Sequence, residues 1–182
     1  TVTNVTGTGT TGTFSVSATG LSSGTQISYR AYATNSQGTS YTSAATFYTL
    51  SVQPTTQASN INFSAAGSNS TNISWTNGDG GFRAVFMKAG SGSITLPSGG
   101  VDYTASTNWS SPGSQLGTSG YYCIYNGTGN SVSVTNLTAG ANYTVRVFEY
   151  NRDESIVATT NYYTSTASGN PASFATLSLE PL

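Results

Sequence analysis

The stretch that decides the fold is LTAGANYTVRVFEYN, residues 137–151. It begins with a leucine and a short polar turn, and then one face of the chain carries Tyr143, Val145 and Val147. Apolar residues at every second position, bounded by turn residues, predict a half-buried β-strand. The first element that the sequence predicts is therefore a strand with one face in a core.

The same layout occurs earlier in the chain, in LSSGTQISYRAYATN, residues 21–35. In both stretches a glycine stands three residues after the leucine, and an asparagine stands five residues after the arginine. Farther along, TFYTLSVQP matches SFATLSLEP, which makes Phe47 equivalent to Phe174. The period between these two residues is about 127 residues, the size of one sandwich domain.

The repeat divides the chain into parts. Residues 1–50 are expected to be the C-terminal part of one module, and residues 51–177 a complete module with a long insertion at 89–120. Residues 178–182, which contain the repeated Pro181, are expected to link to a following module. We therefore expect a window from a longer tandem polypeptide, in which a short linker holds neighbouring modules in a semi-fixed relation.

Composition favours a folded β protein with little charge. Of the 182 residues, 36% are hydrophobic and 12% aromatic, which is enough to build a core. Short β-prone runs separated by Gly, Asn and Ser predict an all-β fold of antiparallel sandwiches, the first one incomplete. Charged residues make up 6%, and a net charge of −1 gives no basic surface for nucleic acid. No apolar run is long enough to insert into a membrane.

Alternation and turn signals place the strands. We expect them at residues 14–18, 27–34 and 41–49 in the first part, and at 61–63, 72–76, 82–88, 121–125, 132–134, 143–150 and 173–177 in the second. The run NGDGG, residues 77–81, predicts a hairpin turn, because Asn, Asp and Gly tolerate positive φ.

Trp75 in an early strand, together with Leu137, Gly140 and Tyr143, resembles the pattern of a fibronectin type III domain, one of the immunoglobulin-like sandwiches. The resemblance implies that the tryptophan fills the centre of the core. It also implies a tyrosine corner, in which the tyrosine hydroxyl bonds to backbone a few residues upstream. The expected core residues are Trp75, Leu137, Tyr143, Val145 and Val147.

Two features depart from the pattern of that family. The corner position in the first part is Ile27, which has no hydroxyl, and the insertion at 89–120 is far longer than a minimal domain contains. The stretches GLSSGTQISYRAYATNSQGTSY, WTNGDGGFRAVFMKAG and GYYCIYNGTGNSVSVTNL are similar to modules of large secreted surface and adhesin proteins of the Bacteroidetes. That resemblance implies an extracellular, cell-surface location and export by the type IX secretion route.

The residue types exclude most catalytic chemistry. With no histidine and one cysteine, the chain has no Ser-His or Cys-His nucleophile and no zinc or iron cluster. A pair of Lys88 with Ser91 or Ser93 is arithmetically possible but disfavoured. The carboxylates available for glycoside hydrolysis lie mostly in predicted turns: Asp79, Asp102, Glu149, Asp153, Glu154 and Glu180. We expect neither an enzyme nor a cofactor.

Two single residues have a functional and a structural interpretation. Asp79 could be a calcium ligand, but calcium takes about six to eight oxygens, so a carboxylate among glycines is more simply part of the turn. Cys123 lies in the middle of a predicted strand, and a small buried core residue is favoured over a reactive thiol.

Aromatic residues around the insertion are the best candidates for a binding site. Tyr103, Trp109 and the pair Tyr121–Tyr122 could stack on sugar faces, although we favour anchoring of the loop onto the sheet by Tyr103 and Trp109. The run Arg152-Asp153-Glu154 lies in a loop that fibronectin-like domains often use for partners, and a solvated loop is favoured there. The candidate binding residues are Tyr103, Trp109, Tyr122, Arg152 and Asp153.

Three hypotheses follow from these observations. The leading one is a non-catalytic structural or adhesive repeat of a large secreted bacterial surface protein, an adhesin or a filament stalk, with neighbouring modules as its partners. The alternative is a glycan-binding or spacer accessory module of a secreted polysaccharide-degrading enzyme. In the third, strands from another chain, or a secretion or assembly partner, complete the half module.

Overall fold

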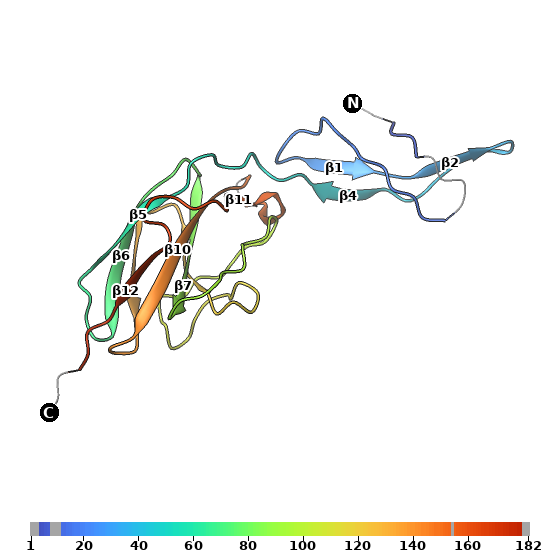
Figure 1. The fold of residues 1–182 in the computed structure, drawn as a ribbon. Helices are drawn as coiled ribbons and strands as arrows, with labels where there is room; N and C mark the ends of the chain where they lie inside the picture. The colour runs from blue at the N-terminus through green and yellow to red at the C-terminus, as the bar shows by residue number, and fades with distance from the viewer. Residues whose placement is uncertain (1–3, 8–11, 154, 180–182) are drawn as a thin grey trace.

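The structure, a computed structural model, describes residues 4–7, 12–153 and 155–179. Glu154, Glu180 and Pro181 lie outside these residues, as does most of the expected linker at 178–182. The fold is all-β, as predicted, with one turn of 3-10 helix, η1 (Val157–Thr159), in the described part of the chain. Strands β1 to β4 form a long hairpin, and β5 to β12 form a sandwich. The hairpin extends away from one end of the sandwich (Figure 1).

Two antiparallel sheets make the sandwich. The first has the order β5-β6-β9, with β5 (Ser59–Ser64), β6 (Ser70–Thr76) and β9 (Ser131–Thr135). The second sheet has the order β11-β10-β7-β8, and β12 pairs with β10 as well. Its strands are β7 (Phe82–Ala89), β8 (Tyr122–Gly127), β10 (Asn142–Asn151), β11 (Asn161–Tyr162) and β12 (Ala172–Ala175). The chain changes sheet from β6 to β7, from β8 to β9 and from β9 to β10. This is a fibronectin type III-like, immunoglobulin-like sandwich.

The inner core lies between the two sheets. Trp75 on β6 is 4% exposed and meets the Tyr125 ring edge-on, with the ring centroids 5.4 Å apart. On β10 the alternation has the predicted effect, because Tyr143, Val145 and Val147 all point into this core. The other buried members of the core are Ala58, Ile61, Ile73, Val85, Met87, Ile124, Val134 and Leu137.

Tyr143 holds the corner before β10. The backbone N–H of Thr138 donates a hydrogen bond of 2.9 Å to the Tyr143 hydroxyl, which closes the turn five residues upstream. The ring of Tyr143 stacks on that of Phe174, its partner on β12, at 5.5 Å. The tyrosine therefore fixes both the turn and the sheet edge.

The insertion forms a third layer on the outer face of the second sheet. Residues such as Ile94, Tyr103 and Leu116 pack there against the outward side chains of β7 and β10, among them Phe86 and Phe148. The Tyr103 ring meets Phe86 at 5.2 Å and Tyr162 at 5.9 Å, both edge-on. This sheet is therefore covered on both sides, which explains why β10 is buried along most of its length.

The run NGDGG does not form the hairpin that the sequence predicts. It connects β6 to β7, which belong to different sheets, and Gly78, Gly80 and Gly81 are not among the residues with positive φ. The glycines are needed for close approach instead: a Cβ on Gly78 would collide with the Thr56 carbonyl, and a Cβ on Gly80 would lie 2.6 Å from Glu149 Oε2.

A buried ion pair holds this connection. Arg83 Nε donates to Glu149 Oε1 at 2.9 Å, and Glu149 is fully buried. The carboxylate also accepts bonds from the N–H groups of Gly78 and Gly80, at 2.8 and 3.1 Å. Arg83 donates to the carbonyls of Gly80 and Thr128. Each charge is thus hydrogen-bonded as well as paired, which a buried charge requires.

The hairpin, residues 21–50, consists of two ladders. In the first, β1 (Gln26–Tyr29) pairs with β4 (Ala45–Tyr48), and in the second β2 (Tyr32–Asn35) pairs with β3 (Gly38–Tyr41). The predicted strands at 27–34 and 41–49 are therefore each interrupted. No described residue from 12 to 50 is buried.

The predicted strand at 14–18 is wrong, because this segment has no regular structure. A single extended segment needs a neighbouring strand to bond its backbone groups, and none lies beside it in the part of the chain that the structure describes.

Replacing Tyr143 with phenylalanine should lower the free energy of unfolding by about 1–2 kcal/mol, because the Thr138 N–H loses its acceptor. Urea denaturation followed by tryptophan fluorescence measures this change. Tyr163→Phe is the matched control, since the Tyr163 hydroxyl has no hydrogen-bond partner among the described residues. Equal losses of unfolding free energy in the two variants would contradict a stabilising hydrogen bond at the corner.

Glu149→Met should cost about 3–5 kcal/mol, because it leaves the Arg83 charge buried without its partner. The double variant Arg83→Met/Glu149→Met should recover much of that loss, since no charge then stays buried. A double-mutant cycle from denaturation curves separates the coupling between Arg83 and Glu149 from the effect of each side chain alone. Purely additive losses would show that the two residues are not coupled.

Candidate functional site

The linker, residues 51–57, is hydrogen-bonded to the sandwich along nearly its whole length. The N–H of Ser51 donates to the Thr159 carbonyl at 2.7 Å, and the Ser51 carbonyl accepts from Asn161 Nδ2 at 2.7 Å. The Val52 carbonyl accepts from the Asn151 side chain, and the Gln53 amide donates to the Tyr162 carbonyl. A short connection that would otherwise be flexible is therefore seated on the sandwich.

Asp79 fixes the second half of the linker. Its carboxylate accepts bonds from the Thr55 hydroxyl at 2.6 Å, the Thr55 N–H at 3.0 Å and the Thr56 N–H at 2.8 Å. The Thr55 hydroxyl, followed by the Thr56 N–H, holds the pKa of the Asp79 carboxyl below its ordinary value of 3.8. These donors occupy the oxygens that a calcium ion would need, so the geometry fits an anchor for the linker better than a metal ligand.

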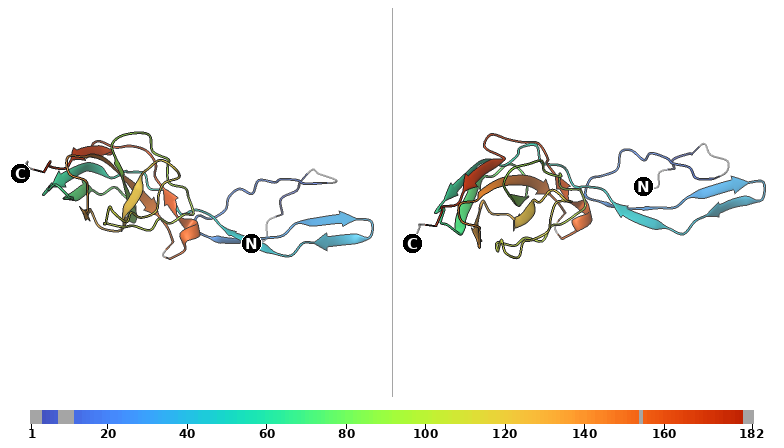
Figure 2. Two further views of the ribbon diagram at one scale, coloured as in Figure 1. Left: turned by 90° about the horizontal axis from the view of Figure 1, so that it is seen from below. Right: turned by 60° about the horizontal axis from the view of Figure 1, so that its bottom comes forward.

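Segments that are far apart in the sequence meet at the junction between hairpin and sandwich. The Leu50 side chain lies against Gly99 of the insertion, and the N–H of Gly100 donates to the Thr160 carbonyl. Gly24, at the base of the hairpin, lies close to Asp153. The residues at η1, β11 and the end of β10 thus bind the linker, and the insertion contacts Leu50 just before it (Figure 2).

The hairpin repeats the edge of the sandwich in register. In the sandwich β10 pairs with β12 so that Tyr143 lies opposite Phe174; in the hairpin β1 pairs with β4 so that Ile27 lies opposite Phe47. These are the residues that the sequence repeat makes equivalent. The first ladder of the hairpin is therefore a second copy of the β10–β12 pair.

The hydrogen bonds at the corner repeat as well. Thr176 Oγ1 donates to the Thr138 carbonyl at 2.6 Å and accepts from Ala141 N–H at 3.0 Å. Its equivalent, Thr49 Oγ1, donates to the Ser22 carbonyl at 2.7 Å and accepts from Thr25 N–H at 2.9 Å. The turn glycines correspond too: Gly140 has φ +66° and Gly24 has φ +62°, a conformation that favours glycine. The corner forms even though Ile27 stands where the tyrosine would be.

The candidate aromatic residues do not form an open platform. The Trp109 ring is half-buried and lies edge-on to Tyr143 at 5.5 Å and to Tyr122 at 5.9 Å. The backbone N–H of Trp109 donates to the Thr135 carbonyl, which ties the insertion to β9. Tyr103 packs in the third layer, with Ser98 N–H bonded to its hydroxyl. Their geometry fits the interpretation that these rings anchor the loop.

Arg152 and Asp153 lie in different surroundings. Arg152 forms an ion pair of 3.2 Å with Asp102 of the insertion and stacks over the Phe82 ring at 4.9 Å. Asp153 is exposed beside the base of the hairpin. The arginine is therefore engaged in holding the insertion, and only the carboxylate faces solvent.

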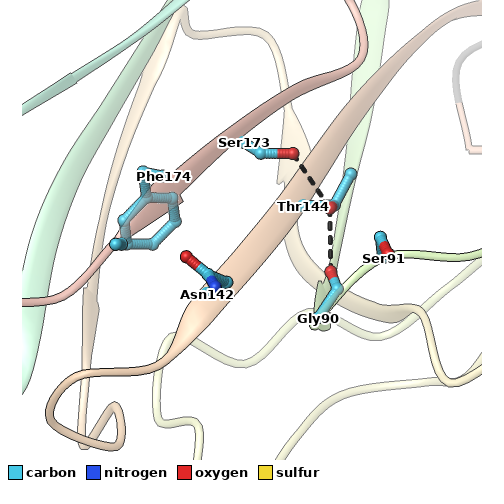
Figure 3. A pocket seen from close by; sticks show the side chains of 7 residues that line it. Gly90, Ser91, Asn142, Thr144, Ser173 and Phe174 are labelled. Atoms are coloured by element: carbon cyan, nitrogen blue, oxygen red, sulfur yellow. Dashed lines mark hydrogen bonds between the residues drawn. The ribbon is translucent and has the colours of Figure 1, made fainter.

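A shallow groove lies where β7 ends beside β10 and β12 (Figure 3). The Thr144 hydroxyl donates to the Gly90 carbonyl at 2.8 Å and lies 3.0 Å from the Ser173 hydroxyl. The full lining is Gly90, Ser91, Asn142, Thr144, Ser173, Phe174 and Ala175. None of these side chains is of a type that commonly acts as a general acid or base.

Cys123 and Lys88 are engaged in packing and hydrogen bonds. Cys123 is fully buried, and burial raises the pKa of its thiol to about 12, so it stays protonated and unreactive at neutral pH. Lys88 bonds to the Ser119 carbonyl at 2.8 Å. Within the described residues there is no cluster of three or more His, Cys, Asp or Glu side chains, and no helix long and apolar enough to cross a membrane.

No protein-family model and no curated protein matches the chain. Among solved structures, the chicken CNTN1 FN1–FN3 domains match 86% of this chain and 44% of their own, with 14% identity and a TM-score of 0.45. A two-domain fibronectin type III segment of chicken tenascin matches 87% and 68%, with 16% identity and a TM-score of 0.37. Titin domains A168–A170 match 74% and 36%, with 13% identity and a TM-score of 0.42. This chain spans less than half of the CNTN1 and titin chains, and the fold assignment rests on strand order and register.

Acid should release the linker. Because the pKa of Asp79 is lower in the folded chain, its hold on Thr55 and Thr56 is complete above about pH 4 and is lost as pH falls through that lowered pKa. NMR should show the amide shifts of both threonines titrating together. Asp79→Ala should produce the released shifts at neutral pH, and Asp153→Asn, at an exposed carboxylate, should not. Unchanged Thr55 and Thr56 amide shifts in Asp79→Ala would contradict the role of Asp79 in holding the linker.

Trp109→Ala should lower the free energy of unfolding by about 2–3 kcal/mol, because a half-buried ring is lost from the inner core. Denaturation curves measure the change, and sedimentation with insoluble polysaccharides tests for binding. If the variant keeps wild-type stability and loses polysaccharide binding, the ring is a glycan contact and not an anchor.

Proposed function

We propose that the chain is a structural repeat of a tandem array, in which each module is seated on the next through a fixed linker. Fibronectin type III-like domains are generally non-catalytic structural modules. The ion pairs and the linker bonds of the described residues support that role, because they hold loops and the linker in place.

The observation that carries the proposal is the hydrogen-bonded linker. Ser51, Val52, Gln53, Thr55 and Thr56 each bond to the sandwich. A free spacer would leave these groups to water and let the two parts rotate. A seated linker instead gives each pair of neighbours one preferred orientation, which an array that carries tension or displays a domain needs.

The repeat supports an array because the residues at the junction recur. Leu50 lies against Gly99, and the Ser51 N–H bonds to the Thr159 carbonyl. Their equivalents after the sandwich are Leu177 and Ser178. Residues 1–50 then belong to one module, 51–177 to the next, and 178–182 begin a connection of the same kind.

The wider setting follows from the sequence resemblance. We propose that the array belongs to a large secreted cell-surface protein of a Bacteroidetes bacterium, an adhesin or filament stalk exported by the type IX route. The low charge, 6% of residues, suits a stalk that should not adhere through electrostatics. The glycan-binding alternative has less support, because the candidate rings pack edge-on against the core.

Residual dipolar couplings test the fixed junction. If the linker is seated, one alignment tensor should fit the amides of the hairpin and of the sandwich in the full chain. The double variant Asn151→Ala/Asn161→Ala, which removes two bonds to the linker, should give two separate tensors. Two tensors already in the wild-type chain would contradict the proposal.

The mass of the native polypeptide that carries this sequence tests the wider setting. We expect several hundred kilodaltons in the surface fraction of the cell, on the order of tens of sandwich-sized modules. A mass near 18.7 kDa would contradict the array.

A further inference from the structure

Two basic residues of the sandwich have no acidic partner. Of the five basic residues in the chain, Arg30 lies in the hairpin and the other four lie in the sandwich. Arg83 and Arg152 each form an ion pair with a carboxylate. Lys88 on β7 and Arg146 on β10 form no ion pair with any residue that the structure describes. The positive charge of the sandwich is therefore uncompensated at these two residues.

Lys88 and Arg146 are neighbours on the outer face of the second sheet. Lys88 lies opposite Thr144 in the β7–β10 pairing, and Arg146 follows Thr144 by two residues on the same face of β10. Side chains in such a diagonal relation have Cβ atoms roughly 7–8 Å apart. Two positive charges at this separation repel each other, and an anion bound beside them would remove that repulsion.

The guanidinium of Arg146 is buried with few of its donors bonded. The residue is 9% exposed, and its guanidinium packs over the Phe148 ring at 4.6 Å from the ring centroid. Of its five N–H groups, one forms a hydrogen bond in the described part of the chain, from Nη2 to the Thr164 carbonyl at 2.6 Å. Nε is buried and has no partner there. A buried charge is costly unless it is both paired and hydrogen-bonded, so Arg146 lacks the counter-charge that its burial requires.

Both cations approach Tyr121 at the start of the insertion. Lys88 Nζ lies 5.7 Å from the centre of the Tyr121 ring, and a Cβ on Gly92 would lie 3.0 Å from the same Nζ. Burial raises the pKa of Tyr121, and the charge of Arg146 offsets part of that rise, which places the guanidinium near the phenol. The Lys88 ammonium has three donors and forms one hydrogen bond among the described residues, to the Ser119 carbonyl. Lys88 is half-buried, so its remaining donors can reach a ligand in solvent.

The shallow groove of Figure 3 begins beside these cations. Gly90 and Ser91 form one wall of the groove, directly before Gly92, and Thr144 lies in the groove opposite Lys88 in register. Hydroxyl and amide groups, which can bond to sugar hydroxyls, follow the groove away from the cations. The exposed ones belong to Ser91, Asn142 and Ser173.

The groove is a poor fit for a peptide with apolar side chains. Its one large apolar lining residue is Phe174, whose ring stacks on Tyr143 in the inner core at 5.5 Å. Recognition of an extended peptide depends on pockets for its side chains, and this lining supplies small and polar residues instead.

We infer that the groove and the adjacent cations form a binding site for an acidic saccharide. The carboxylate of a uronic acid residue pairs with the Lys88 ammonium and is stabilised by the neighbouring charge of Arg146. The hydroxyls of that sugar and of the next one bond to the polar side chains along the groove. All residues of the site lie in the sandwich, so the inference does not depend on the repeat or on the linker.

The test titrates the full 182-residue chain with trigalacturonic acid, followed by calorimetry and by ¹⁵N-resolved NMR. We expect shifts of the Gly90, Ser91 and Thr144 amides, and an affinity that falls as salt is raised from about 0.01 M to about 0.15 M. The matched control is the same trisaccharide with its carboxylates reduced to alcohols, which should not bind.

Four results of these titrations overturn the inference. The first is the lack of any shift at the solubility limit of trigalacturonic acid, and the second is equal binding of the reduced trisaccharide. The third is equally tight binding of triglutamate, which would assign the site to an acidic peptide. The fourth is equally tight binding of inorganic sulfate, which would leave the sugar ring without a role.

Variants locate the charges that bind. Lys88→Gln should weaken binding of trigalacturonic acid by about tenfold or more, because a charge-assisted hydrogen bond is lost. Arg146→Met should weaken it by about fivefold, because the neighbouring charge is removed. Arg30→Gln removes the same charge from the hairpin and should leave the affinity within about twofold. Urea denaturation verifies that each variant is folded. Equal losses in all three variants, or an unchanged affinity in Lys88→Gln, overturn the inference.

Discussion

Both parts of the chain depend on one antiparallel pairing, the one that sets Tyr143 opposite Phe174 and Ile27 opposite Phe47. A threonine two residues beyond the phenylalanine, Thr176 or Thr49, closes the corner in each copy by donating to one carbonyl and accepting from one N–H. These bonds are satisfied locally and need no second sheet. The corner can therefore form in the hairpin, where the described residues provide only two-stranded ladders.

The corner does not by itself bury the apolar side chains of the paired strands. In the sandwich the sheet that contains β10 is buried on its inner side by β5, β6 and β9, and on its outer side by the insertion. The same alternation in the hairpin leaves apolar rings such as Tyr29 in water. The linker, in contrast, is well bonded, because Asp79 and the side chains of Asn151 and Asn161 form hydrogen bonds with its backbone. The described residues thus combine a hydrogen-bonded linker with an exposed apolar face on the hairpin beside it.

The sequence predicted what local periodicity and the family resemblance determine. Period-two alternation located β10, and the resemblance placed Trp75 in the core and the Tyr143 hydroxyl at the corner. It failed where the outcome depends on distant partners: residues 14–18 have strand alternation but pair with no strand among the described residues, and the glycines of NGDGG serve close packing against Glu149 and Thr56. The Arg83–Glu149 pair and the bonds from Asp79 to the linker join residues more than twenty positions apart, so no spacing rule could have found them.

Residue-resolved amide hydrogen exchange on the full chain tests the central claim, a complete sandwich beside an uncovered copy of its edge. The account predicts that the amides of β6, β7 and β10 exchange only through global unfolding and share one free energy of opening. The amides of β1 and β4, and that of Thr49 just after β4, should exchange at a far lower free energy, because no core must open to expose them. Equal protection in β1 and β10 would contradict the account, since it would mean that the apolar face of the hairpin is already covered.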